Sequence, residues 1–258
     1  MIFFYSLLIF SLGACLGSFA NVCIYRLPRN KQIVSGRSFC PKCKKKIKWY
    51  DNLPLISFII LNRKCRNCNK VIPARYFIVE LITGIAFLLI YLNFKNLNTI
   101  IFLSILVLIL IIIFFIDLEN FIIPDTLNFS IMGLALFKNF LPNFNTSLIH
   151  EINQSIIGGM VGYISIWLII YLYKIFKKID GMGLGDAKLM AGIGFLFGWQ
   201  SIPFVLFIPS ILGLIFVVPS LIRKQKNMRT EIPFGPFIIL ACLIYFAYGS
   251  WVYDLILV

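Results

Sequence analysis

Long apolar runs, separated by shorter polar segments, dominate the pattern of hydrophobic and polar positions along this chain. Most of the runs reach the roughly 17 to 25 residues that a bilayer-spanning helix needs. Backbone groups in lipid must be hydrogen-bonded within their own segment, so each run is expected to be a helix. We therefore predict an all-α polytopic membrane protein with about eight transmembrane helices, near residues 2–24, 76–94, 99–116, 127–141, 154–176, 187–200, 202–222 and 234–253.

The basic residues indicate how these spans are oriented. Residues 26–76 carry 14 Lys or Arg, and residues 174–188 and 223–229 carry four each, whereas the opposite loops hold only Lys95 and Lys138. Cytoplasmic loops carry an excess of Lys and Arg, so the N-terminus is predicted outside and the large first loop in the cytoplasm. The net charge of +14 is thus better explained by membrane topology than by nucleic-acid binding, and no nucleic-acid partner is expected.

Three segments follow from this pattern: residues 1–24 as a first transmembrane helix, 25–75 as a basic cytoplasmic loop and 76–258 as a membrane-embedded domain. A removed secretory signal is disfavoured, because such a signal opens with Lys or Arg and this chain opens with Met-Ile-Phe-Phe-Tyr-Ser. Residues 1–24 are therefore expected to be retained.

Two Cys-x-x-Cys pairs lie in the basic loop, "CPKC" from Cys40 to Cys43 and "CRNC" from Cys65 to Cys68. Two such pairs at this separation are typical of a structural zinc site with four cysteine ligands. A reducing cytoplasmic location disfavours disulfides, although free or redox-active thiols stay an alternative. The other cysteines fall in or beside apolar runs and are expected to be small buried hydrophobes: Cys15, Cys23 and Cys242.

Acidic residues are rare, and several gather at the predicted cytoplasmic ends of spans. Ionisable side chains at the edge of lipid are costly unless they face protein or water, which makes them functional candidates. Asp125 can instead cap the helix that begins beside it. Asp117 fits that alternative poorly, because a negative charge at a helix C-terminus meets the negative end of the helix dipole. The set comprises Glu80, Asp117, Glu119, Asp125, Asp180 and Asp186.

The segment "GMGLGD" ends in Asp186 after glycines at 181, 183 and 185. Glycines leave the backbone bare, so another extended peptide can approach the aspartate closely. Two aspartates at a partly desolvated site share one proton, and such a pair activates water for attack on a peptide carbonyl. The only histidine, His150, is predicted on the other side of the membrane, which leaves Ser-His and Cys-His nucleophiles without a base.

Six motifs in one order give the chain its resemblance to a known family: "GSFANVCIYRLP", the two cysteine pairs, "ARYFIVE", "DLENFIIPD", "GMGLGDAKL" and "IPFGPF". The sequence resembles the prepilin peptidases, the type IV leader peptidase family of GxGD aspartyl proteases. The resemblance implies that Asp117 and Asp186 are the catalytic pair and that residues 76–258 form a membrane-embedded aspartyl peptidase with its active site at the cytoplasmic face. It also implies supporting or substrate-binding roles for Glu80, Asp125, Gly183, Gly185 and Lys188.

Members of this family remove the leader of type IV prepilins or pseudopilins in a bacterial cell membrane, and many then methylate the new N-terminus with S-adenosylmethionine. The cysteine loop is associated with the methyltransferase part. Relatives commonly have glycine two residues before the third cysteine, where this chain has Arg63. The resemblance thus implies prepilin substrates in the bilayer, structural zinc, and S-adenosylmethionine if methylation occurs.

Two other classes of protein share some of these features. A zinc-ribbon membrane scaffold would need the cysteines but not the aspartates. A transporter would place its carboxylates near the bilayer midplane, within broken helices, whereas those of this chain lie near span ends. The leader peptidase is the reading that accounts for both the aspartates and the cysteines.

Overall fold

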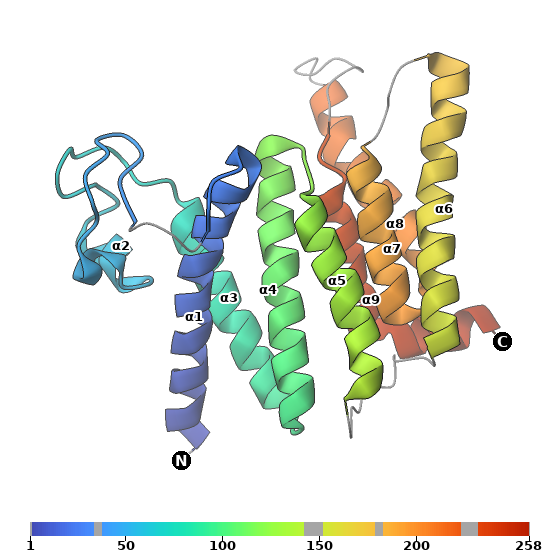
Figure 1. Ribbon diagram of the computed structural model, residues 1–258, viewed down its shortest axis with the longest axis horizontal. Helices are drawn as coiled ribbons and strands as arrows, with labels where there is room; N and C mark the ends of the chain where they lie inside the picture. Colours follow the sequence, from blue (N-terminus) through green and yellow to red (C-terminus); the bar gives the residue numbers. More distant parts are fainter. Residues whose placement is uncertain (1, 34–37, 142–151, 179–182, 223–231, 258) are drawn as a thin grey trace. The chain divides into compact units, whose positions relative to one another are not determined.

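A computed structural model describes residues 2–33, 38–141, 152–178, 183–222 and 232–257 (Figure 1). Within these ranges the chain is helical, and its extended pairs are two isolated bridges in the cysteine loop. This confirms the predicted all-α class. His150 and Gly181 lie outside the described residues. The chain forms two compact units, Met1–Ile112 and Ile113–Val258, which are described separately below.

The first unit is built around two long helices that pack side by side. Glycines on α1 allow the close approach to α3: a Cβ at Gly13 would lie 2.9 Å from the carbonyl oxygen of Thr83, and one at Gly17 would lie 2.8 Å from Cα of Glu80. Small residues four apart are the usual device for such contacts between membrane helices. The elements are α1 (Ile2–Arg26), η1 (Leu27–Arg29), η2 (Trp49–Asn52), α2 (Ile56–Ile60), α3 (Arg75–Asn93) and the start of α4 (Leu97–Asn120).

The second unit has α7 at its centre, in contact with its neighbouring helices. Nearly every side chain of α7 after its first turn is buried, including Leu189, Met190 and Ile193. The elements are the end of α4, α5 (Asp125–Phe137), η3 (Lys138–Phe140), α6 (Ile152–Lys177), α7 (Leu184–Phe197), α8 (Ser201–Ile222) and α9 (Gly235–Leu257).

Glycine contacts bring α6 against α7. A Cβ at Gly158 would lie within 2.3 Å of the carbonyl oxygen of Gly194, and one at Gly162 would lie 2.6 Å from that of Met190. The two backbones therefore touch with no side chain between them. This contact sets the position of α7, whose first turn carries Asp186.

The far end of α7 is held by a buried lysine. Lys138, 1% exposed, donates hydrogen bonds from Nζ to the carbonyl oxygens of Leu196 at 2.5 Å and Phe195 at 3.3 Å. These carbonyls close the last turn of α7, and a cation there is favoured by the helix dipole. In the sequence, Lys138 was counted only as one of two basic residues on the side opposite the basic loops.

The helices coincide with the predicted spans to within a few residues. Helices α1, α3, α4 and α6 are long and apolar enough to cross a membrane, and α8 and α9 contain shorter apolar stretches. Helices α5 and α7 are 13 and 14 residues long, in agreement with the two short runs. The total of eight spans stays a prediction, and the short helix α2 was not predicted.

The three cysteines outside the loop differ in their surroundings. Cys23 and Cys242 are buried, as expected, but Cys15 is exposed. The expectation for Cys15 was wrong because an apolar run does not reveal which face of its helix packs against protein. Two positions before it, Gly13 meets α3, and Cys15 lies on another face of α1.

Candidate active site and cysteine cluster

Asp117 lies in the last turn of α4, which extends four residues beyond the predicted span end. The helix ends as Phe121 adopts a left-handed φ of 58°. The Asp117 side chain is 4% exposed, and its Oδ2 accepts a hydrogen bond of 2.9 Å from the main-chain N–H of Gly235. Gly235 is the first residue of α9, so the carboxylate lies at the positive end of a helix dipole.

Gly235 leaves no room for a side chain. A Cβ there would lie 2.8 Å from Oδ2 of Asp117 and 3.1 Å from Cδ1 of Ile123. The glycine of the "IPFGPF" motif is thus required by the approach of its backbone to the aspartate. The motif by itself did not indicate this role for Gly235, and its position between two Pro-Phe pairs was the available signal.

Asp186 lies in the first turn of α7 and is 9% exposed. Its carboxylate accepts a hydrogen bond from the main chain of Gly183 and is close enough to Asp117 for the two charges to interact. Its Oδ1 is buried and has no hydrogen-bond partner within the described part of the chain. The structure therefore brings together the two aspartates that the sequence singled out, and within the described part of the chain one buried oxygen of Asp186 has no hydrogen bond.

The two described glycines of the GxGD segment have different surroundings. Gly183 is exposed and extended, and a Cβ there would have no neighbour closer than 3.8 Å. At Gly185 a Cβ would lie 3.2 Å from Cβ of Ile123, so this glycine serves close packing within the protein. The bare surface expected from the sequence is therefore present at Gly183 and absent at Gly185.

Asn128 is a residue of this site that sequence analysis missed. It is fully buried in α5, and its Nδ2 donates a hydrogen bond of 3.3 Å to the carbonyl oxygen of Gly185. It thereby holds the turn before Asp186 against α5. One asparagine in an apolar run was the only available signal.

Asp125 and Lys188 form an ion pair at the surface of the second unit. Nζ of Lys188 lies 2.7 Å from Oδ1 of Asp125, and the two side chains are 27% and 55% exposed. Asp125 is the first residue of α5, after Pro124 at the cap position, and the cap makes no side-chain hydrogen bond. Asp125 thus has a cationic partner of its own and is far more exposed than Asp117.

Glu80 belongs to the first unit and connects α3 to the cysteine loop. Its side chain is 8% exposed, and Oε2 accepts a hydrogen bond of 2.8 Å from the main-chain N–H of Leu55. Leu55 has a φ of 60°, an uncommon conformation for a branched residue, and immediately precedes α2. Glu80 therefore anchors the loop to the helix pair of its own unit.

The four loop cysteines form one cluster. Their Sγ atoms all lie within 4.8 Å of one another, and those of Cys40 and Cys68 are 3.9 Å apart, in hydrogen-bond contact and not joined by a disulfide. Four thiolates around a tetrahedral zinc ion are separated by about 3.8 Å. The cluster therefore has the spacing and donor set of a four-cysteine metal site.

The two cysteine pairs share one backbone pattern. In the first pair, the N–H of Cys40 donates to the carbonyl oxygen of Lys45, and the N–H of Lys44 donates to that of Cys40. In the second pair, the N–H of Cys65 donates to the carbonyl oxygen of Lys70, and the N–H of Asn69 donates to that of Cys65. Lys44 and Asn69 have left-handed φ values of 58° and 53°. Each pair is thus a tight turn that presents two thiols on one side.

The thiols have unequal proton affinities. The main-chain N–H of Asn67 is the largest influence on Cys65 and lowers its pKa to about 7. At Cys68 a main-chain contact with Lys70 lowers the pKa, but burial and the neighbouring thiols outweigh it and raise the pKa to about 11. Four thiols this close cannot all ionise without a compensating cation, and metal binding requires their thiolate forms.

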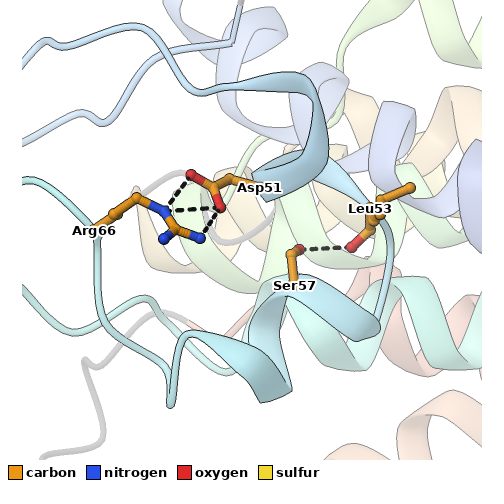
Figure 2. A network of polar contacts seen from close by, with 4 residues as sticks. All are labelled: Asp51, Leu53, Ser57 and Arg66. Carbon is orange, nitrogen blue, oxygen red and sulfur yellow. Dashed lines mark hydrogen bonds and ion pairs between the residues drawn. The ribbon is translucent and has the colours of Figure 1, made fainter.

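An ion pair joins the second cysteine pair to η2. Arg66 contacts both carboxylate oxygens of Asp51, with a shortest distance of 2.7 Å (Figure 2). Nearby, the hydroxyl of Ser57 donates to the carbonyl of Leu53 at 2.6 Å, which links the start of α2 to the preceding turn. Solvent screens the exposed Arg66 end of this ion pair, so the pair contributes little by itself, but its two-pronged geometry orders the loop.

Arg63 has a φ of 60°, in the left-handed region that favours glycine. Its guanidinium lies 5.8 Å from the ring centre of Phe58. The glycine expected from the family resemblance would suit this backbone without strain. Arg63 thus retains the backbone conformation of the turn although the residue type differs.

Comparison with known proteins gives matches along most of this chain. Residues 11–94 match the model of the bacterial peptidase A24 N-terminal domain, and residues 104–218 match that of the type IV leader peptidase family. A prepilin leader peptidase/N-methyltransferase from Vibrio cholerae serotype O1 is 38% identical over 250 residues, covering 93% of this chain and 96% of that protein. The chain belongs to the type IV leader peptidase family.

Other relatives of the family show a similar extent of likeness. A protein of the same name from Aeromonas salmonicida is 30% identical over 95% of this chain and 91% of its own length. One from Dichelobacter nodosus is 32% identical over 91% of this chain and 88% of its own length. No solved structure matches the chain. The resemblance drawn from the six motifs is confirmed, and the chain is a multi-pass membrane protein of this peptidase family.

Proposed function

We propose that this protein is a membrane aspartyl endopeptidase that removes the leader peptide from type IV prepilins or pseudopilins. The observation that carries the proposal is the pair of buried aspartates, Asp117 and Asp186, held on two different helices of one unit and close enough to interact. The similar proteins are named prepilin leader peptidases, which supports the choice of substrate. A scaffold would have no need for two buried carboxylates.

In the proposed reaction the two aspartates hold one proton between them. The ionised carboxylate takes a proton from water as the water oxygen bonds to the peptide carbonyl carbon, and the protonated partner gives its proton to the carbonyl oxygen. The C–N bond then breaks as the nitrogen takes a proton from one aspartate and a hydroxyl of the tetrahedral intermediate returns its proton to the other, so the pair again holds one proton. The Gly235 N–H stabilises negative charge on Asp117 whenever it develops, and Oδ1 of Asp186, which is buried without a hydrogen bond among the described residues, is the atom we assign to the water.

The choice of Asp117 over Asp125 as the partner of Asp186 rests on their surroundings. Asp117 is buried and interacts with Asp186, whereas Asp125 is 55% exposed and paired with Lys188. We infer supporting roles for Lys188, which neutralises Asp125, and for Gly183, whose exposed backbone suits the approach of an extended substrate.

We propose that Cys40, Cys43, Cys65 and Cys68 hold a structural zinc ion. Zinc would fix the loop, which is too small to form its own core, and would take no part in proteolysis. Methylation of the new N-terminus with S-adenosylmethionine is a second proposed activity, supported by the N-methyltransferase part of the relatives' names. The excess of basic residues in the same loops supports a cytoplasmic active site and an external N-terminus in a bacterial membrane.

A leader-cleavage assay tests the proposal. Membranes containing the wild type, Asp117→Asn, Asp125→Asn or Asp186→Asn are mixed with a panel of prepilins, and the loss of the leader is followed by gel shift. We expect cleavage by the wild type and by Asp125→Asn, and at least a 1000-fold loss, roughly, for the other two. Cleavage that survives both Asp117→Asn and Asp186→Asn would rule out the aspartyl mechanism. An inactive wild type on every prepilin would favour the scaffold.

A further inference from the structure

The short helix α2 presents most of its apolar side chains to the surroundings. Only Phe58 turns inward, and its ring stacks on that of Phe77 in α3 with the ring centres 5.2 Å apart. The outward residues are as exposed as the outward apolar side chains of the long helices. They form what we define as the isoleucine face: Ile56 (56% exposed), Ile59 (64%) and Ile60 (68%).

Two contacts fix the position of α2 along α3. The N–H of Leu55, just before α2, bonds to Glu80, and Phe58 stacks on Phe77. Glu80 is the sixth residue of α3, which begins at Arg75, so at 1.5 Å per residue it lies about 8 Å along the helix. Helix α2 therefore lies beside the first turns of α3 rather than beyond its end (Figure 1).

Helix α3 is itself a candidate membrane span. It exposes Ile78, Ile82 and Ile85, each between 41% and 43%, at a spacing that places them on one face. The isoleucine face thus lies beside the end of a helix that already presents apolar side chains outward. An exposed apolar surface at this depth is suited to the boundary between acyl chains and headgroups.

The charges around α2 indicate which lipids suit it. Residues 26–76 contain 14 Lys or Arg and a single acidic residue, Asp51, which is paired with Arg66. Trp49, 74% exposed, lies just before the turn that leads to α2, and tryptophan is enriched at membrane interfaces. Basic residues beside an apolar face are the usual composition of segments that bind anionic membrane surfaces.

We propose that the isoleucine face is inserted in the adjacent leaflet, at the level where anionic phospholipid headgroups meet the acyl chains. The cysteine loop is thereby docked on the membrane by α2 as well as by its two flanking spans. Glu80 and Phe77 hold α2 at the required depth, and the basic residues that follow α2, Arg63 and Lys64, contact the headgroups.

Photo-crosslinking of the full-length protein tests this proposal. Ile60→p-benzoylphenylalanine and, as control, Lys45→p-benzoylphenylalanine are each reconstituted in nanodiscs of phosphatidylcholine and phosphatidylglycerol. Both positions are exposed, but Lys45 lies in the first cysteine turn. After irradiation, intact-protein mass spectrometry should show a phospholipid adduct several-fold more abundant at position 60. Replacing phosphatidylglycerol with phosphatidylcholine should lower that yield several-fold.

Other outcomes would overturn the proposal. Equal lipid labelling at positions 60 and 45 would show that α2 is not inserted, and unchanged labelling without phosphatidylglycerol would remove the preference for anionic lipid. A crosslink from position 60 to a second copy of the chain, or to a prepilin added to the nanodiscs, would assign the face to a protein partner instead. Unchanged thermal unfolding and a single elution peak establish that both substituted chains are folded.

Discussion

The hydrogen bond from Gly235 to Asp117 is the contact that most directly supports the proposed chemistry. The donor is a backbone N–H at the start of α9, so no side-chain rotation is needed to make it. A bond to a charged carboxylate contributes about 1.5–3 kcal/mol, which corresponds to roughly 10- to 150-fold in rate if it acts in the transition state.

Gly235→Ala should therefore impair cleavage without unfolding the protein. The new Cβ would lie 2.8 Å from Oδ2 of Asp117, so the carboxylate or the start of α9 must move. We expect kcat for prepilin cleavage to fall about 10- to 100-fold with little change in KM.

Gly213→Ala is the matched control, because its Cβ would meet Phe237 at an ordinary 3.9 Å. It should cleave at the wild-type rate. Wild-type kcat for Gly235→Ala would show that the hydrogen bond does not position Asp117 for the reaction.

Among the helices, the pairing of α6 with α7 determines where Asp186 lies. The backbone contact at Gly158 and Gly194 admits no side chain, and Gly162 repeats it one turn further along. Lys138 then holds the last turn of α7. The position of the first turn of α7, which carries Asp186, is thus fixed by the packing of α7 on α6 and by the hydrogen bond from Asn128 to Gly185.

Gly158→Ala should separate these two helices. Its Cβ would lie within 2.3 Å of the carbonyl oxygen of Gly194, and such overpacking costs about 1–3 kcal/mol. The expected result is a lower thermal unfolding temperature of the detergent-solubilised protein.

Gly133→Ala in α5 is the control variant for Gly158→Ala, because the added Cβ has no neighbour within 4 Å. It should leave stability unchanged or raise it by about 0.5–1 kcal/mol, because alanine favours a helix more than glycine does. Equal unfolding temperatures for Gly158→Ala and the wild type would show that α6 does not pack on α7 through this contact.

At the scale of the whole molecule, the cysteine cluster and the aspartate pair lie in different compact units, residues 1–112 and 113–258. The proposed roles of the two are accordingly separable. Loss of metal should disorder the cysteine loop, which has few buried apolar side chains, and leave the aspartate pair in place.

Cys40→Ser should abolish zinc binding and largely spare leader cleavage. Inductively coupled plasma mass spectrometry should find about one zinc ion per chain in the wild-type protein and almost none in the variant. Cleavage should stay within about threefold of the wild type, since no ligand of the cluster belongs to the aspartate pair.

Cys15→Ser, at an exposed position of α1 outside the cluster, serves as the control and should retain zinc. Metal-free wild-type protein would contradict the structural zinc. A loss of cleavage in Cys40→Ser as large as that in Asp117→Asn would contradict the separation of the two roles.

The sequence by itself determined the all-α membrane class, the cysteine pairs, the peptidase family and both aspartates as candidates. These features depend on composition and short spacing: apolar runs long enough for lipid, two thiols per tight turn, and carboxylates where few others occur. Such signals are local, so they can be read along the chain.

Only the tertiary structure decided which surroundings each candidate has. Asp117 and Asp125 are eight residues apart, and the sequence favours Asp117 without proving the choice. In the structure Asp117 is buried and interacts with Asp186, whereas Asp125 is paired with Lys188 at the surface. The roles of Asn128 and Gly235, and the exposure of Cys15, likewise follow from contacts between helices distant in sequence. Burial and charge pairing are properties of the packed helices, which a one-dimensional pattern does not specify.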